Sequence, residues 1–155
     1  MKKLFALILA TIPFLAACNW EFHKPTDQMN ALNEMQQTDV DFSNRSKEAG
    51  MKQAFLEYME DEAVLLRQNR LPLVGAFAVD YLSSIEDSSF SLTWEPQGAD
   101  MSRSGDLGFT YGIYSMQIND STYKGTYVTI WRKQNSGKWK MVLDTGNQGI
   151  GKDQE

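Results

Sequence analysis

The fold is decided by residues 104–145, which read SGDLGFTYGIYSMQINDSTYKGTYVTIWRKQNSGKWKMVLDT. From Ser88 onward apolar and polar residues alternate with a period of two, and β-branched and aromatic residues accumulate, as is typical of strands. We expect four strands in this half of the chain, over residues 90–99, 107–118, 123–133 and 138–145. We expect the four strands to be joined in hairpin order, and turn-forming residues at 119–121 and 135–137 connect the last three.

The half of the chain before Ser88 follows the 3.6-residue period of helices instead. This period predicts a helix over residues 27–48 that carries Met29, Leu32, Met35, Val40 and Phe42. A shorter helix is marked by Met51, Ala54, Phe55 and Tyr58. The apolar run 63–66 favours a small strand, and a third helix begins after Gly75. Helices followed by consecutive strands predict an α+β domain whose antiparallel sheet is covered on one face by the helices.

The composition is that of an ordinary globular protein with one compact domain. The chain has 155 residues, of which 42% are hydrophobic and 23% charged. Its single cysteine excludes an internal disulfide, a thiolate zinc cluster and a Cys-x-x-Cys redox pair. Its single histidine, His23, excludes most histidine-based metal sites. We therefore expect no metal ion and no cofactor.

The N-terminus has the features of a secretory signal peptide. Lys2 and Lys3 precede an apolar run over residues 4–17. As a helix this run would span roughly 21 Å, too short for a hydrocarbon core of about 30 Å. Such a segment is typical of a signal peptide rather than of a transmembrane helix.

Residues 15–18, Leu-Ala-Ala-Cys, resemble the lipobox of bacterial lipoproteins. The resemblance implies that Cys18 becomes the lipidated first residue of the mature protein and anchors it to a membrane. It also implies the outer membrane, facing the periplasm, because Asn19 stands where an aspartate would retain a lipoprotein in the inner membrane. Two alternatives remain open: an ordinary Ala-x-Ala-type cleavage site with a coincidental cysteine, and a short buried helix.

The charge balance argues against nucleic acid as a partner. Loss of residues 1–17 would remove two lysines and leave 13 basic residues against 20 acidic ones. An acidic domain repels phosphate backbones, and the sequence has no basic stripe interleaved with aromatic residues. We expect no nucleic-acid binding.

The pattern of the chain resembles the nuclear-transport-factor-2-like (NTF2-like) superfamily, and within it the DUF4440 or SnoaL-like group of bacterial proteins. The most specific segments are residues 104–108, 110–112, 125–133, 137–140 and 143–144. The helical half also fits, from Phe42 to Gly75, and the resemblance covers residues 27–147. It implies a cone-shaped fold, with three N-terminal helices packed on a curved, mostly antiparallel sheet around a pocket. Members often dimerise through the outer face of the sheet, so a homodimer is an expectation.

These observations divide the chain into a signal peptide over residues 1–17, a lipidated spacer over 18–26, the NTF2-like domain over 27–147 and a flexible tail over 148–155. Within the domain we expect a pocket near Phe55, Tyr58, Asp61, Trp94, Tyr111, Tyr127, Trp131 and Asp144. Apolar walls with a few polar groups are typical of small-ligand sites. The alternative is that the aromatic side chains among these simply fill the core between helices and sheet.

Two functions remain in view, because this fold hosts isomerases, cyclases, dehydratases and binding subunits. The first is an envelope lipoprotein that binds a small, partly apolar ligand or a protein partner. The second is an enzyme of the isomerase, dehydratase or cyclase type, with Asp61 or Asp144 as base and Tyr58 or Tyr111 as hydrogen-bond donor to an enolate oxygen. The sequence contains no serine-hydrolase elbow, phosphate-binding loop, zinc-protease motif or dinucleotide fingerprint.

Two further motifs have simpler explanations than a site. Residues 144–146, Asp-Thr-Gly, imitate the triplet of aspartic proteases, but a strand end followed by a glycine turn explains them better. The acidic cluster Glu57, Glu60, Asp61 and Glu62 lacks the spacing and glycine of a calcium loop, so a solvated helix end is expected.

Overall fold

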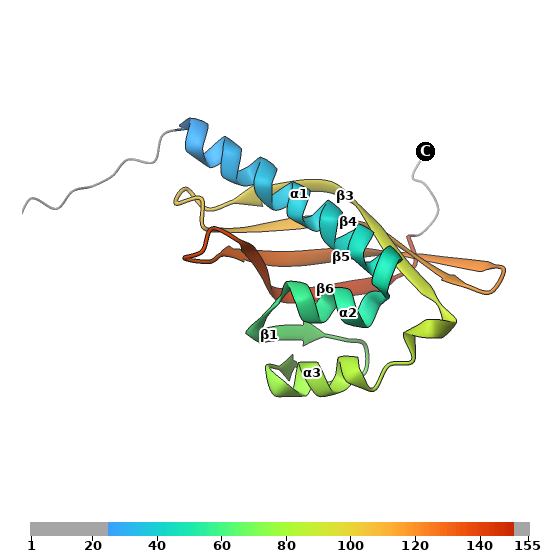
Figure 1. Ribbon diagram of the computed structural model, residues 1–155. Helices are drawn as coiled ribbons and strands as arrows, with labels where there is room; N and C mark the ends of the chain where they lie inside the picture. Colours follow the sequence, from blue (N-terminus) through green and yellow to red (C-terminus); the bar gives the residue numbers. More distant parts are fainter. Residues whose placement is uncertain (1–24, 151–155) are drawn as a thin grey trace, which may run out of the picture.

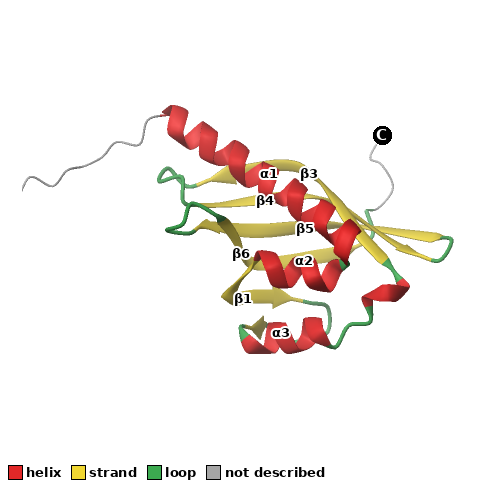
Figure 2. Cartoon of the chain, in the orientation of Figure 1, coloured by secondary structure: helices red, strands yellow, loops and turns green. Residues whose placement is uncertain are grey.

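A computed structural model describes residues 25–150 of the chain. The expected signal peptide, Cys18 and residues 151–155 of the expected tail lie outside the described residues. Along the described chain the elements are α1 (Pro25–Ala49), α2 (Met51–Tyr58), β1 (Met59–Leu66), β2 (Leu73–Val74), α3 (Ala76–Ser83), a short 3₁₀ helix (Asp87–Ser89), β3 (Ser91–Met101), β4 (Leu107–Ile118), β5 (Ser121–Lys133) and β6 (Trp139–Gln148). Figures 1 and 2 show these helices and strands in the same orientation.

The strands form one six-stranded sheet in the order β2-β1-β6-β5-β4-β3. β3 to β6 pair in chain order as antiparallel neighbours, which confirms the expected hairpin order. β1 pairs with β6 in parallel and with the two-residue β2 in antiparallel orientation. The α+β expectation, with a mostly antiparallel sheet, is confirmed.

Two boundaries differ by three residues or more from the sequence-based expectation, and the others by two or fewer. β1 begins at Met59, so Glu60, Asp61 and Glu62 lie in a strand rather than at the end of a helix. β6 continues beyond Thr145 to Gln148. The reason is tertiary pairing: β1 gains a partner in β6, which follows it by more than 70 residues, and local periodicity does not report such a partner.

The curvature of the sheet has identifiable causes in β3 and β4. The register shifts between Pro96 and Gly98 of β3, which is a β-bulge that bends the strand. Opposite the bulge, Gly112 lies so close to β3 that an added Cβ would stand 2.1 Å from the carbonyl oxygen of Glu95. Only glycine permits this approach, so the bend depends on residues of both strands.

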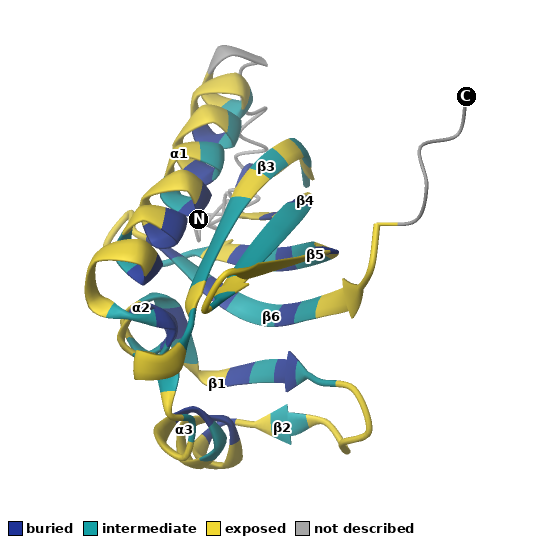
Figure 3. Ribbon diagram, turned by 90° about the vertical axis from the view of Figure 1, so that its right-hand side faces the viewer, coloured by how far each residue is buried: buried dark blue, intermediate teal, exposed yellow. Residues whose placement is uncertain are grey.

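The helices cover one face of the sheet (Figure 3). α1 lies along this face, and its buried residues follow one another at helical spacing: Ala31, Met35, Asp39, Phe42, Ser43 and Ser46. This stripe differs from the expected one, because Met29 and Val40 are exposed at 64% and 37% of their surface. The buried face of α1 includes polar residues. A face drawn through the apolar residues alone is therefore rotated away from the one that is buried.

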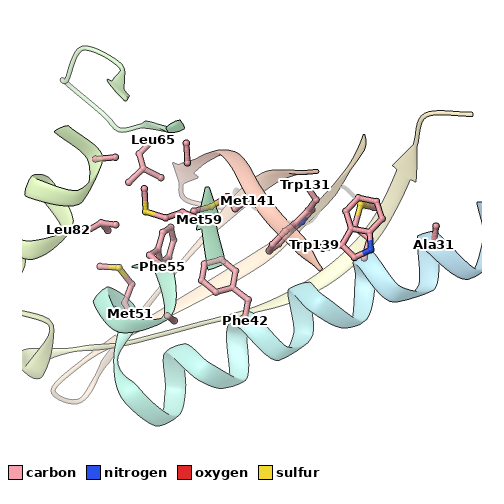
Figure 4. Close-up of a cluster of buried hydrophobic side chains, with 14 residues drawn as sticks. Ala31, Phe42, Met51, Phe55, Met59, Leu65, Leu82, Trp131, Trp139 and Met141 are labelled. Carbon is pink, nitrogen blue, oxygen red and sulfur yellow. The ribbon is translucent and has the colours of Figure 1, made fainter. Parts of the chain in front are cut away.

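The core fills the space between the helices and the sheet (Figure 4). Phe42 of α1 lies at its centre, with its ring centroid 4.8 Å from that of Phe55 and 4.5 Å from that of Trp94. Trp131 of β5 is fully buried 5.9 Å away and meets Phe42 edge to face. Such edge-to-face pairs add to the stabilisation that comes from burial alone.

The outer face of the sheet carries large apolar side chains, and Leu107, Phe109 and Tyr111 are exposed there. The homodimer expected from the sequence stays a prediction. Across residues 25–150 no helix is both long and apolar enough to span a membrane.

Candidate ligand-binding cavity

A cavity of about 420 Å³ opens between the inner face of the sheet, the helices and the turn that follows β1. Its apolar wall consists of Phe42, Met51, Phe55, Leu82, Ile85, Leu92 and Met116. The remaining lining is polar or amphipathic and includes Arg67, Arg70, Tyr81, Trp94, Tyr114, Tyr127, Thr129 and Asp144. Small-molecule sites have this size and this combination of apolar walls with a few polar groups.

The turn after β1 places two arginines at the cavity. The Arg70 N–H donates to the carbonyl oxygen of Arg67 across 3.2 Å, which closes a four-residue turn. Asn69, the third residue, has a φ of 59°, in the left-handed region that asparagine tolerates better than most residues. Both arginines line the cavity, so local turn chemistry positions part of the site.

An ion pair holds Arg67 in place. Its Nη2 donates to Oδ1 of Asp144 at 2.7 Å, and its Nη1 donates to the carbonyl oxygens of Asp144 and Leu66, each at 3.0 Å. The second carboxylate oxygen of Asp144 accepts a hydrogen bond of 2.9 Å from the Thr129 hydroxyl. Asp144 therefore enters the cavity as a partnered carboxylate whose charge Arg67 balances.

A second carboxylate, Asp39 of α1, is fully buried between the helix and the sheet. Its Oδ1 accepts from Nε1 of Trp94 at 2.8 Å and its Oδ2 accepts from the Tyr127 hydroxyl at 2.7 Å. Burial raises the pKa of Asp39, and the hydrogen bonds from Tyr127, Trp94 and Thr110 oppose that rise. Burial and the nearby Asp39 also raise the pKa of Tyr127, so this phenol stays protonated at neutral pH.

The raised pKa of Asp39 predicts a pH dependence of stability. The folded protein binds this proton more tightly than the unfolded chain, where the pKa is near 3.8. The contribution of Asp39 to stability is therefore fully present when the pH is below the pKa of this residue in the unfolded chain. It is lost as the pH rises through the pKa in the folded protein. The variant Asp39→Asn does not titrate. Its amide oxygen can still accept from Trp94, and its amide nitrogen can donate to the Tyr127 oxygen.

We expect the free energy of unfolding of the wild type, relative to Asp39→Asn, to fall with rising pH by at most about 1.4 kcal/mol per pH unit. Urea unfolding of both proteins between about pH 4 and 8 measures this difference. Parallel stability curves for the two proteins would contradict the assignment.

The structure brings together some of the residues singled out from the sequence and separates others. Phe55, Trp94, Tyr127 and Asp144 line the cavity. Trp131 lies in the core, where its Nε1 donates to the Thr110 hydroxyl at 2.9 Å.

Tyr58, Asp61 and Tyr111 lie outside the cavity lining. Tyr58, the last residue of α2, stacks on the Phe42 ring with centroids 4.9 Å apart. Asp61 is an exposed residue of β1. Tyr111 is half exposed on the outer face of β4, since the alternation of that strand turns the neighbouring buried residues Thr110 and Gly112 inward.

Sequence reasoning missed Asp39, Arg67, Arg70 and Tyr114. Two of them carried a signal. Asp39 lies four residues after Met35 and three before Phe42, which is the spacing of one helix face. Arg67 continues the alternation of the buried residues Ala63 and Leu65. Arg70 belongs to a turn and had no periodicity to indicate it.

No group of three or more His, Cys, Asp and Glu side chains that could hold a metal ion occurs within residues 25–150.

No protein-family model matches the sequence, and no curated protein matches it either. Solved structures do match. A ketosteroid isomerase-like protein from Erwinia carotovora atroseptica superposes with a TM-score of 0.63 at 15% identity, over 78% of this chain and 97% of that one. An NTF2-like protein with a cystatin-like fold from Novosphingobium aromaticivorans gives 0.63 at 10% identity, over 80% and 85%. A hexachlorocyclohexane dehydrochlorinase from Novosphingobium barchaimii gives 0.61 at 12% identity, over 82% and 92%.

At this level of identity the likeness concerns the fold alone. Three helices on a curved, open and mostly antiparallel six-stranded sheet form the cone-shaped NTF2-like fold.

Proposed function

We propose that this protein is a lipid-anchored envelope protein whose cone-shaped domain binds a small, partly apolar ligand. The observation that carries the ligand-binding part is the cavity of about 420 Å³, which combines an apolar wall with the hydrogen-bonded polar groups of Arg67, Asp144 and Thr129. An interior evolved only for stability would be close-packed, without voids of this size. A cavity open to solvent and lined with aromatic rings is suited to a ligand that brings its own apolar surface.

Blocking the cavity tests this proposal. Ile85 lines the cavity and is half-buried, so a tryptophan there would occupy ligand space. Native mass spectra of the wild-type protein, purified from its own cells, are expected to show a mass excess that disappears on denaturation. Ile85→Trp is expected to lose that excess while its circular dichroism stays unchanged. Equal excess masses in both proteins would place the bound molecule elsewhere and contradict the proposal.

The enzyme hypothesis keeps one specific observation in its favour. Asp144 and Tyr114 both line the cavity, so a carboxylate and a phenol hydroxyl share one partly apolar space. In this form Tyr114 takes the donor role expected of Tyr58 or Tyr111, since the Tyr127 hydroxyl already donates its proton to Asp39, and Asp144 is the base.

A double-bond shift in a β,γ-unsaturated ketosteroid, followed by ultraviolet absorbance of the conjugated product, tests this hypothesis. Turnover that Asp144→Asn abolishes without loss of folding would establish the enzyme. Absence of turnover, with the steroid still bound, would favour a binding protein.

The envelope location rests on the N-terminal sequence. Residues 15–18 supply a lipobox-like motif, and a cysteine consumed by lipidation would leave no free thiol in an oxidising compartment. Stable anchoring takes two acyl chains, because one chain binds membranes only marginally.

Mass spectrometry of the membrane-extracted protein is expected to show acyl chains on Cys18 and loss of residues 1–17. Density-gradient separation of the two bacterial membranes is expected to place the protein in the outer one. In Cys18→Ser the acylation should disappear. An unmodified cysteine in the wild type would contradict the anchor without affecting the cavity proposal.

A further inference from the structure

The charge of the cavity is opposite to the charge of the chain. The protein carries a formal net charge of −5, yet among residues 25–150 the charged side chains that line the cavity are two arginines, Arg67 and Arg70, and one carboxylate, Asp144. In an acidic protein, a local excess of cationic side chains at a cavity indicates a preference for anions.

The two arginines have different partners. Arg67 is 2.7 Å from Asp144, so these two charges balance each other. Arg70 has no carboxylate oxygen within 4.0 Å among residues 25–150. Its guanidinium instead lies over the Tyr81 ring, with Cζ 4.8 Å from the ring centroid. The unbalanced positive charge of the cavity is therefore that of Arg70.

Stacking on Tyr81 holds the Arg70 guanidinium at the cavity without using its N–H groups. A guanidinium presents five donors in a planar fork that matches a carboxylate, sulfonate or phosphate. The turn 67–70 keeps Arg70 beside Arg67, whose own guanidinium lies 5.6 Å from the Phe55 ring centroid. The anion-binding groups and the aromatic wall are thus adjacent.

The apolar part of the cavity wall offers no partner for a charge. Leu92 and Met116 come from the sheet and Leu82 and Ile85 from the α3 side. A ligand that satisfies both parts has an apolar body and one anionic end. We infer that the cavity selects an amphipathic anion, with its charged group at Arg70 and its apolar body against Phe55, Leu92 and Met116. This inference rests on the proposed ligand-binding function and adds the chemical class of the ligand.

Two fluorescent probes of the same shape test the inference. 8-Anilinonaphthalene-1-sulfonate is anionic, and N-phenyl-1-naphthylamine has the same ring system without the sulfonate. We expect the wild-type protein to bind the anionic probe more tightly than the neutral one, and less tightly as salt is added. Arg70→Gln should weaken binding of the anionic probe about five- to tenfold and change binding of the neutral probe less than about twofold.

The matched control is Arg103→Gln. Arg103 is an exposed arginine between β3 and β4 that does not line the cavity, so its loss changes the net charge by the same amount. We expect it to leave the affinity of both probes unchanged. If Arg70→Gln and Arg103→Gln weaken the anionic probe equally, the effect is one of net charge and the inference fails.

A cavity-blocking variant separates failure of the inference from failure of the proposed function. Ile85→Trp should weaken both probes, and Met116→Trp, from the opposite wall, serves the same purpose if the first variant does not fold. If Ile85→Trp weakens binding of both probes but Arg70→Gln leaves binding of the anionic probe unchanged, the anion preference is overturned and the binding cavity is retained. If neither cavity-blocking variant weakens binding of either probe, the probes bind elsewhere, and both the anion preference and the proposed binding cavity are overturned.

Discussion

Replacing Phe42 with alanine is expected to lower the free energy of unfolding by about 3 to 5 kcal/mol. The Phe42 side chain is 1% exposed and joins α1 to α2 and the sheet. Its ring lies within 6 Å, centroid to centroid, of the rings of Phe55, Tyr58, Trp94 and Trp131. Alanine would remove those contacts and leave a void that neighbouring rings, held by their own packing, fill only in part.

Urea unfolding followed by far-ultraviolet circular dichroism measures this effect. The matched control is Phe109→Ala, because Phe109 lies on the outer face of the sheet and is 39% exposed. We expect the control to change the free energy of unfolding by about 1 kcal/mol or less. Equal losses for the two variants would show that Phe42 is not the centre of the core.

Replacing Arg67 with alanine is expected to lower the free energy of unfolding by about 2 to 4 kcal/mol. Asp144 is buried, with its side chain 10% exposed, and Arg67 supplies its only cationic partner among residues 25–150. The variant would leave a carboxylate partly out of water with the Thr129 hydroxyl as its remaining side-chain partner. An unpaired charge in such a place costs more than the ion pair itself contributes.

A double variant distinguishes the lost pair from the stranded charge. Arg67→Ala combined with Asp144→Asn leaves a neutral amide whose oxygen can still accept from Thr129. We expect the double variant to be more stable than Arg67→Ala alone, so the two effects are strongly non-additive. Additive losses would show that Arg67 and Asp144 do not interact in solution.

The strands of the second half were predictable because each is long and lies in a hairpin with its sequence neighbour. β4 and β5 pair residue for residue from Leu107–Arg132 to Ile118–Ser121, and the turn at Asn119 has the positive φ that asparagine tolerates. In such local pairing, periodicity and turn chemistry report on the same contact. The last strand, β6, could be predicted for the same reason, although the sequence did not predict that it continues to Gln148.

The candidate site was only partly predictable, because its residues come from segments far apart in the chain. Arg67 meets Asp144 across a separation of 77 residues, and Asp39 meets Tyr127 across 88. Alternation places Tyr127 and Tyr111 each on one face of a strand but does not say which face is covered by helices. Tyr127 proved to face α1 and Tyr111 the outside.

The amino-acid sequence by itself determined the fold class, the three helices, the hairpin order of the last four strands and the aromatic content of the interior. These follow from local propensity and periodicity, which act between residues close in the chain. Only the tertiary structure decided which carboxylates are buried, which arginine has a carboxylate partner and which has none, and that β1 pairs in parallel with β6. Burial and charge pairing depend on what lies a few ångströms away in space, and here those neighbours are distant in the sequence.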